Sequence, residues 1–310
     1  MDAALFGLIV ADVIAQPMNL RRPPASGGMQ LLNSISLTTG GNVCNAGVAM
    51  AKLGMEVAAA GLVGDDVLGR AIVEQLTKAK VETSAVFTTD RAQTSATVVA
   101  VEPGGERCFF HTTGATTLLD ADAFRRCFPT FRTCAWVQIG YFGLLPTITP
   151  QLPELLRELK REAPGTKIAL DTVNPPADAK LLWPILPHVD LFAPSRAEAS
   201  ILTTYKRPET MAGALRKRMS ESAIIGIKLD SAGCYLDDGK QAVTVPAYKV
   251  DVVDTTGAGD TWFGALLVAL RKNMPLEQAA KFANRAAADC CTALGASAGV
   301  KTFEDTLARL

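Results

Sequence analysis

Short apolar segments alternate along this chain with segments whose apolar residues recur at helical spacing, and this alternation is the strongest constraint on its fold. Residues 5–11 and 57–63 are runs typical of buried strands, and Val43, Ala46 and Met50 between them have the spacing of a helix face. The alternation continues with expected strands at 135–139, 167–171, 189–192 and 223–228, and with expected helices at 68–76 and 150–162 and from Ser195, Gly257 and Pro275. It predicts an α/β fold with a doubly wound, mostly parallel sheet flanked by helices.

Two stretches interrupt this alternation. Residues 13–39 are rich in proline and glycine, and residues 94–111 have the pattern of two strands around the turn sequence Pro103-Gly104-Gly105. We expect both stretches to form a small β excursion from the main sheet, inserted in a single domain that spans residues 1–310.

Composition excludes several classes of function. The 31 Lys and Arg residues balance the 31 Asp and Glu residues, and no basic run is present, so no nucleic-acid partner is expected. The longest apolar runs, residues 263–270 and 5–11, are far shorter than the roughly 20 residues of a membrane-spanning helix, so no membrane partner is expected either. Asp2 and Asp12 flank the first run where an export signal would have a basic residue and a longer apolar core. We therefore interpret that run as a buried first strand.

Cysteine and histidine usage narrows the chemistry. The seven cysteines are an odd number and include no C-x-x-C pair, which predicts free thiols, no zinc site and a cytoplasmic location. Only two histidines, His111 and His188, are present. Acid–base chemistry at neutral pH is therefore expected to depend on a carboxylate.

Polar residues follow several of the expected strands, and in doubly wound sheets ligands bind beyond the carboxyl ends of the strands. Such residues are Asp12, Gly40-Gly41-Asn42, Asp171, Ser195 and residues 254–260. Each alone has a more ordinary explanation as a helix cap or a turn residue. Their recurrence at the same end of the sheet favours a shared binding site.

The sharpest of these segments is Asp254-Thr255-Thr256-Gly257-Ala258-Gly259-Asp260, because the apolar spacing after it places a helix start inside the glycine pair. Backbone N–H groups at such a start, together with the positive end of the helix dipole, form an anion hole. Asp260 in the first turn would stand beside the anion and accept the proton of an attacking hydroxyl. The alternative is a glycine-rich turn followed by an acidic first turn.

The segment Gly40-Gly41-Asn42 opens another expected helix. Asn42 and Asn45 on its first turn carry amide groups that suit the hydroxyls of a polyol, although Asn42 as a simple N-cap is the alternative. Asp12 suits two neighbouring sugar hydroxyls or, alternatively, a turn. Ser195 and Glu198 match the reciprocal capping box, which predicts a structural role for Glu198.

Competing motifs are absent. The sequence has no G-x-x-x-x-G-K-[ST] loop and no G-x-G-x-x-G after the first strand, which excludes the P-loop and dinucleotide-binding fingerprints. Residues 295–299 match a serine-hydrolase elbow, but no histidine follows Ser297 as that fold requires.

The two glycine segments together resemble the signatures of the ribokinase-like (PfkB-type) sugar and nucleoside kinases. Gly40-Gly41-Asn42 with Asn45 and Leu53-Gly54 is similar to the N-terminal signature, and residues 254–261 with Phe263 are similar to the more diagnostic C-terminal one. The resemblance extends over nearly the whole chain. It implies a ribokinase-like fold, a small β lid formed by residues 13–39 and 94–111, and ATP-dependent phosphorylation of a primary hydroxyl of a monosaccharide or sugar-like acceptor.

The resemblance also implies roles for individual residues. Asp260 would be the general base, and the amides of Gly257, Ala258 and Gly259 would stabilise the transferring phosphoryl group. The other implied contacts are Asp12, Gly41, Asn42 and Asn45 for the sugar; Lys228, Gly233 and Asn284 for ATP; Glu198 for Mg²⁺; and Asp254 and Thr256 for a monovalent cation such as K⁺. Lids of relatives also pair subunits, which implies a homodimer through the lid.

Some positions depart from the family pattern. Ser195 stands where the family's Asn-x-x-Glu has asparagine, Lys228-Leu229-Asp230 places a carboxylate near the expected nucleotide, and Gly114-Ala115-Thr116 replaces Gly-Ala-Asn. The cation loop near Gly295 has Ala293 and Gly299 where relatives usually have Arg and Ser. These departures leave two other functions open, a nucleoside kinase of the same family and a catalytically silent relative that binds sugar or nucleotide.

Overall fold

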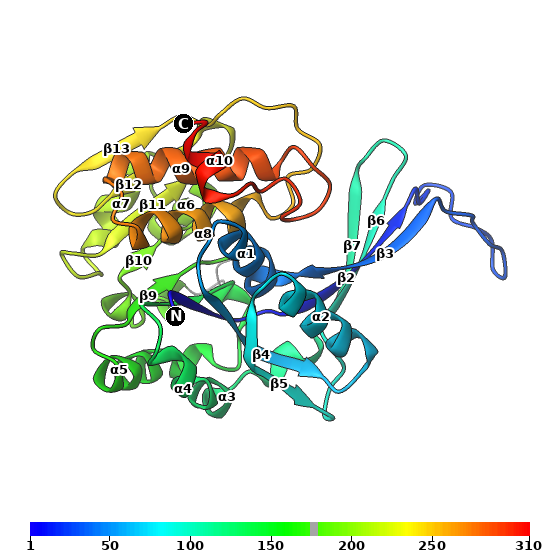
Figure 1. Cartoon of the computed structure of the whole chain (residues 1–310), viewed down its shortest axis with the longest axis horizontal. Coiled ribbons are helices and arrows are strands. Elements are labelled where there is room, and N and C mark those ends of the chain that lie inside the picture. Colours follow the sequence, from blue (N-terminus) through cyan, green and yellow to red (C-terminus); the bar gives the residue numbers. More distant parts are fainter. Residues whose placement is uncertain (174–178) are drawn as a thin grey trace.

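The computed structural model describes residues 1–173 and 179–310, and in this part of the chain a nine-stranded sheet runs through the centre of the molecule (Figure 1). Its strands, in spatial order, are β13 (Ala242–Val245), β12 (Cys234–Asp237), β11 (Ile224–Lys228), β10 (Leu191–Phe192), β9 (Lys167–Leu170), β8 (Trp136–Ile139), β1 (Ala3–Phe6), β4 (Val57–Gly64) and β5 (Glu82–Thr89). The only antiparallel pairs of this sheet, among the described residues, are β11–β12 and β12–β13. The predicted doubly wound, mostly parallel sheet is confirmed.

Helices cover both faces of this sheet and bury two apolar cores. One core is formed with α1 (Gly41–Lys52), α2 (Val67–Lys78), α8 (Ala258–Arg271) and α9 (Leu276–Cys290), with α10 (Phe303–Leu307) packed outside α9. The other is formed with α3 (Ala121–Arg126), α4 (Phe128–Phe131), α5 (Leu152–Glu162), α6 (Arg196–Thr203) and α7 (Pro208–Arg216). Strands buried on both sides explain why their sequences are continuous apolar runs.

A second, four-stranded sheet projects from one end of the molecule (Figure 1). Its order is β3 (Ser34–Gly40), β2 (Val10–Gln16), β6 (Ala96–Val101) and β7 (Arg107–Thr112). The antiparallel pair β6 and β7 turns around residues 103–105, as the sequence predicts. The β excursion therefore exists as a separate small sheet.

The expected first strand at residues 5–11 is wrong in its extent. β1 ends at Phe6, and Gly7 to Ile9 carry the chain from the main sheet into β2 of the small sheet. Gly7 has φ 149°, and a Cβ atom there would lie 2.7 Å from Oδ1 of Asn42 and 2.9 Å from the carbonyl oxygen of Gly140. Asp12 consequently lies inside β2, opposite Thr38 and Thr97, and does not end the first strand.

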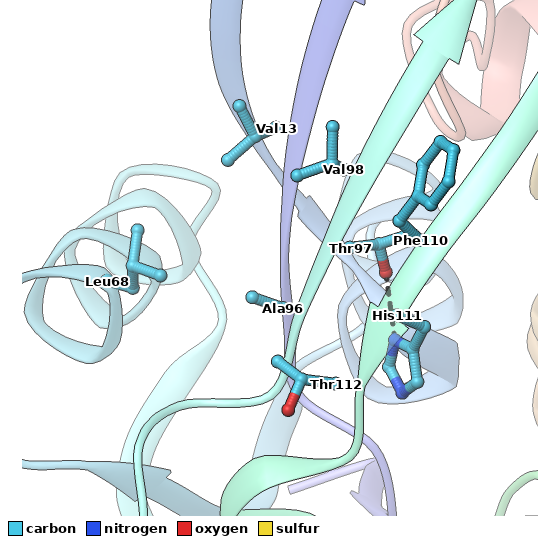
Figure 2. Close-up of a pocket in the computed structure, with 8 residues that line it drawn as sticks. All are labelled: Val13, Leu68, Ala96, Thr97, Val98, Phe110, His111 and Thr112. Atoms are coloured by element: carbon cyan, nitrogen blue, oxygen red, sulfur yellow. Dashed lines mark hydrogen bonds between the residues drawn. The ribbon is translucent and has the colours of Figure 1, made fainter. Parts of the chain in front are cut away.

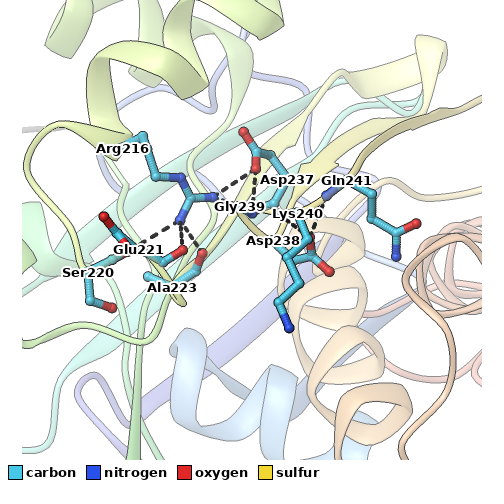
Figure 3. A network of polar contacts seen from close by, with 9 residues as sticks. All are labelled: Arg216, Ser220, Glu221, Ala223, Asp237, Asp238, Gly239, Lys240 and Gln241. Carbon is cyan, nitrogen blue, oxygen red and sulfur yellow. Dashed lines mark hydrogen bonds and ion pairs between the residues drawn. The ribbon is translucent and has the colours of Figure 1, made fainter.

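An arginine fixes the far edge of the main sheet (Figure 3). Arg216, the last residue of α7, donates through Nη2 to the carboxylate of Asp237 at 2.9 Å and through Nη1 to the carbonyl oxygens of Ser220 and Glu221 at 3.3 and 3.2 Å. This network ties α7 to the β12 strand end and has no part in the site described below. No helix among residues 1–173 and 179–310 is long and apolar enough to cross a membrane.

Candidate active site

The first turn of α8 places Asp260 in a buried position where three other elements converge. Its Oδ2 atom accepts hydrogen bonds from Asn45 Nδ2 of α1 and from the Tyr141 hydroxyl that follows β8, both at 2.8 Å. Its Oδ1 atom receives no hydrogen bond from the part of the chain that the structure describes. One oxygen of the carboxylate is thus held in place, while the other is left to accept a proton.

Burial raises the pKa of Asp260 above its ordinary value, because the charged form loses its hydration. The hydrogen bonds from Asn45 and Tyr141, and the charge of Lys228, partly oppose this shift. A carboxylate with a raised pKa is a stronger base than one in water, which is the property that proton abstraction needs.

Backbone donors surround Asp260. Gly257 is the N-cap of α8 with φ 72°, and a Cβ atom there would lie 2.6 Å from the carbonyl oxygen of Ala296, so this position requires glycine. The N–H groups of Gly257, Gly259 and Asp260 have no acceptor among residues 1–173 and 179–310. The positive end of the helix dipole adds to their attraction for an anion.

The amide of Ala258 differs from the prediction. It donates to the carbonyl oxygen of Thr255 at 3.2 Å, which closes the turn that starts α8. The free donors are therefore the amides of Gly257, Gly259 and Asp260 instead of those of residues 257–259.

A lysine faces the same helix start. Nζ of Lys228, at the end of β11, lies 2.8 Å from Oδ1 of Asp171 at the end of β9 and 4.0 Å from where a Cβ atom of Gly259 would stand. Burial alone would lower the pKa of Lys228, but the carboxylates of Asp171 and Glu198 raise it above its ordinary value. Lys228 is therefore a permanent cation beside the free amides.

Two asparagines of α1 carry buried atoms without partners. Asn42 Oδ1 accepts the N–H of Leu8 at 3.0 Å, while Asn42 Nδ2 and Asn45 Oδ1 have no partner among the described residues. Asn42 does not cap its own helix, whose N-cap is Gly40 without a side-chain bond, so the N-cap interpretation is wrong. Buried unpaired amide atoms are costly unless a ligand or water satisfies them.

Gly41 and Asp12 lie near these asparagines. Gly41 has φ 80°, and a Cβ atom there would meet the carbonyl of Leu8, so the start of α1 requires glycine. The carboxylate of Asp12 lies against Gly40, where any side chain would displace it. Burial raises the pKa of Asp12, and Thr97 and His111 on the neighbouring strands oppose the shift.

The side-chain amide of Asn284 of α9 is hydrogen-bonded at both ends to groups of this chain. Its Nδ2 donates to the carbonyl oxygens of Val245 and Pro246, both at 3.0 Å, and its Oδ1 accepts from Trp262 Nε1 at 2.8 Å. Both ends of the amide therefore hold α9 against β13 and α8. This gives the amide a structural role, while the placement of Asn284 in the nucleotide pocket stays a prediction.

The other predicted nucleotide and metal residues lie at neighbouring strand ends. Gly233, with φ 101°, directly precedes β12, and a Cβ atom there would meet the backbone of residues 245–247. Glu198 Oε2 accepts the N–H of Ser195 at 2.7 Å and Ser195 Oγ accepts the N–H of Glu198 at 3.3 Å, so the predicted capping box is confirmed. Burial raises the pKa of Glu198, and Lys228 opposes this.

Asp254 and Thr256 are engaged by an arginine from the small sheet. Arg107 of β7 donates through Nη1 to both Asp254 Oδ1 and Thr256 Oγ1, and Asp254 Oδ2 accepts the N–H of Gly295 at 2.7 Å. Burial would raise the pKa of Asp254, but Arg107 and then the Gly295 and Thr256 amides lower it to about 2. Neither oxygen of this carboxylate is free.

Sequence reasoning missed Tyr141 and Arg107. Tyr141 directly follows Gly140 after β8, so the rule that polar residues at strand ends form the site would have found it. Its left-handed backbone, with φ 56° and ψ 45°, turns the side chain toward Asp260. Arg107 gave no signal, because it lies 147 residues before Asp254 in a different sheet.

Comparison with known proteins decides the family. The model of the pfkB family carbohydrate kinases matches residues 2–302. This chain belongs to that family. It is 31% identical over 281 residues to the ribokinase of Bacillus subtilis, and this alignment covers 90% of each protein. It is 29% identical over 290 residues to fructokinase-1 of Oryza sativa, and that alignment covers 86% of this chain and 87% of the relative. As a pfkB carbohydrate kinase it is a phosphotransferase, as predicted.

Solved structures of pfkB-type proteins share the fold. The Arabidopsis thaliana ribokinase complexed with ribose and ATP superposes with a TM-score of 0.81 at 23% identity, covering 99% of this chain and 97% of the other. A putative ribokinase II from E. coli in complex with ATP and Mg²⁺ gives a TM-score of 0.83 at 19% identity, covering 100% and 99%. The predicted ribokinase-like fold is confirmed.

Proposed function

We propose that this pfkB kinase transfers the γ-phosphoryl group of ATP to a primary hydroxyl of a monosaccharide, with Asp260 as the general base. The observation that carries the proposal is the free Oδ1 atom of Asp260 beside the unpaired amides of Gly257 and Gly259. The hydroxyl gives its proton to Oδ1 as it attacks phosphorus, while the amides and the Lys228 ammonium stabilise the charge on the phosphoryl oxygens. Asn45 and Tyr141 keep the carboxylate aimed during this step.

Asn42 and Asn45 are proposed to hold the sugar. The unpaired Asn42 Nδ2 donates to a sugar hydroxyl and the unpaired Asn45 Oδ1 accepts from one, which satisfies both buried atoms. Asp12 accepts from further hydroxyls, and the backbone of Gly41 lets the ligand approach closely. Because Asn45 also contacts Asp260, binding of the sugar and orientation of the base are linked.

ATP and Mg²⁺ are proposed as cosubstrate and cofactor, in keeping with the ligands of the Arabidopsis and E. coli structures. Mg²⁺ in kinases is held mainly by phosphate oxygens and water, with one or two carboxylates. Glu198 fits this need, since the capping box uses Oε2 and leaves Oε1 for the ion's hydration shell. Mg²⁺ would neutralise charge on the phosphates, and Gly233 would let the backbone approach the nucleotide.

The small sheet is proposed to be the lid. The strand register puts Asp12, Thr97 and His111 on one face of this sheet. We propose that this face turns to the sugar. Closure of this face over the substrate would exclude the water that otherwise hydrolyses ATP.

The opposite face of the small sheet supports a homodimer. A hollow of about 590 Å³ lies between the sheet and α2. Val13, Leu68, Val98 and Phe110 are among the residues that line it (Figure 2). Val98 and Phe110, with Ile35 on the same face, are 40, 57 and 70% exposed, which is unusual for a group of large apolar side chains. A homodimer through the lid would cover them, and sedimentation equilibrium of the wild-type protein and of Ile35→Lys tests it.

A cytoplasmic location remains the prediction made from the cysteines, all seven of which are free thiols.

Release of ADP from ATP over a panel of pentoses, hexoses and nucleosides tests the activity. Turnover with a monosaccharide supports the proposal. Turnover with nucleosides alone would identify a nucleoside kinase, and tight binding of sugar or ATP without ADP release would identify a silent binding protein.

A further inference from the structure

The segment of residues 254–257 and 290–297 is where the family resemblance places a monovalent cation, and the side-chain oxygens of Asp254 and Thr256 there are already hydrogen-bonded to groups of this chain. Both oxygens of Asp254 accept hydrogen bonds, Oδ1 from Arg107 and from the N–H of Thr256 and Oδ2 from the N–H of Gly295. The hydroxyl of Thr256 also accepts from Arg107. A dehydrated K⁺ ion has no free carboxylate oxygen here, so these residues do not fit the expected cation.

Two backbone carbonyl oxygens of this segment contact a thiol of α9. Sγ of Cys290 lies 3.1 Å from the carbonyl oxygen of Ala296 and 3.7 Å from that of Thr256. Ala293 and Gly299, which replace the usual Arg and Ser of the cation loop, supply no side-chain ligand.

Arg107 supplies the positive charge that this segment needs. Its side chain is 17% exposed and that of Asp254 is 2% exposed, so the pair is shielded from solvent and from screening by salt. The strand register puts Arg107 on the same face of the small sheet as Asp12. Counted from the Val99–Phe109 pair, Arg107 lies two residue pairs closer to the β6–β7 turn. The same sheet face therefore carries Asp12, a predicted sugar contact, and Arg107, the cation that pairs with Asp254 before α8.

The contact of Arg107 with Thr256 bears on the anion hole directly. Thr256 is joined to Gly257, the N-cap of α8, and Gly257 packs on Ala296. An ion pair that holds Asp254 and Thr256 fixes the direction of the next amides in the chain. Arg107 is in this sense a positioning residue, because it acts through the loop and not on the substrate.

We propose that the guanidinium of Arg107 replaces the monovalent cation of related kinases, so that this enzyme works without K⁺ and receives its cation only when the lid sheet is in place. The inference rests on the proposed kinase function. It predicts that loss of Arg107 opens a cation site at Asp254 and makes turnover dependent on K⁺.

The test compares the wild-type protein with Arg107→Met in chloride salts of K⁺ and of tetramethylammonium, at an ionic strength of about 0.1 M so that general screening is equal. Wild-type kcat/KM should be the same in both salts. The variant should lose about ten- to a hundredfold in tetramethylammonium and recover much of this loss in K⁺. Arg22→Met is the matched control, because Arg22 is an exposed arginine of the loop between β2 and β3 and should behave as the wild type.

A second readout does not depend on catalysis. K⁺, compared with tetramethylammonium, should raise the thermal unfolding midpoint of Arg107→Met and leave those of the wild type and Arg22→Met unchanged, because only a vacated site binds the ion. Stimulation of the wild type by K⁺ would overturn the inference, and so would a variant that shows neither recovery nor a K⁺-specific midpoint shift. If no sugar is phosphorylated, the proposed function fails while the unfolding comparison still decides the cation question. The wild-type measurement needs no variant and stays decisive if Arg107→Met does not fold.

Discussion

The hydroxyl of Tyr141 donates a 2.8 Å hydrogen bond to Oδ2 of Asp260, and Asn45 donates to the same oxygen. Two donors from different elements thus hold one carboxylate oxygen, and the other accepts no hydrogen bond from the described residues. Burial raises the pKa of Tyr141 well above its ordinary value, and Asp260 adds to the shift, so the phenol stays protonated and remains a donor at every working pH.

Tyr141→Phe should move the acid limb of the pH–rate profile to higher pH. Burial raises the pKa of Asp260 and the hydrogen bond from Tyr141 opposes that rise, so its removal raises the pKa further. Because Asp260 acts as a base only when ionised, activity is lost as the pH falls through this pKa. The profile of kcat/KM measures the shift, with Tyr205→Phe, an exposed tyrosine, as the control. An acid limb at the wild-type position would contradict the assigned contact.

Lys228→Met should destabilise the fold as well as weaken ATP binding. The Lys228–Asp171 pair is buried, and removing one partner leaves an unpaired carboxylate, a loss of roughly 3–5 kcal/mol in such pairs. Urea unfolding measures this loss, and the double variant with Asp171→Asn should recover part of it. A double variant that is less stable than Lys228→Met would show that the loss of stability does not come from an unpaired Asp171 carboxylate.

Asn284→Leu separates a structural role from a nucleotide contact. The variant leaves Trp262 Nε1 and two carbonyl oxygens without partners, which should lower the free energy of unfolding by about 1–3 kcal/mol. KM for ATP should stay near the wild-type value at a temperature where the variant is folded. A large rise of KM with unchanged stability would restore the nucleotide contact that the sequence predicts.

Two glycines of the α8 start should respond differently to alanine. A Cβ atom at Gly259 would lie 4.0 Å from Lys228 Nζ, its nearest neighbour, so Gly259→Ala should fold normally and lower kcat/KM for ATP by crowding the phosphate. Gly257 has φ 72° and packs against Ala296, so Gly257→Ala should also lower the unfolding free energy by at least about 1 kcal/mol. Thermal unfolding and kinetics of both variants check this difference. Equal stability of the two variants would contradict it.

Most of the architecture follows from periodicity, because strands buried on both faces and amphipathic helices leave clear signals. The break after Phe6 is hidden in the sequence because the residues on both sides of it are apolar, and only the turn at Gly7 separates the main sheet from β2. The core of the site is predictable for another reason, since Asp260, Asn42 and Asn45 lie in glycine segments that open helices.

The remaining site features depend on groups that meet across the fold. The position of Asn284 in the chain does not reveal that Trp262 and the carbonyl oxygens of Val245 and Pro246 use its amide, so the sequence alone favours a ligand contact there. Arg107 is equally hidden, because its contact with Asp254 joins a strand of the small sheet to a loop that is distant in the sequence.

One feature of the anion hole depends on local backbone geometry. The amide of Ala258 lies between two glycines and is expected to face the anion, but the turn that joins it to the carbonyl oxygen of Thr255 directs it elsewhere. A glycine pattern predicts where a helix starts, and it does not specify which of the first amides stay free.

Asp260→Asn tests the central claim most directly. The substitution keeps the size of the side chain and removes the basic oxygen, so turnover of the preferred sugar, followed by ADP release, should fall by roughly 10²- to 10⁴-fold while the protein stays folded and still binds the sugar. Turnover within a few-fold of the wild type would show that another group takes the proton, and would contradict the account.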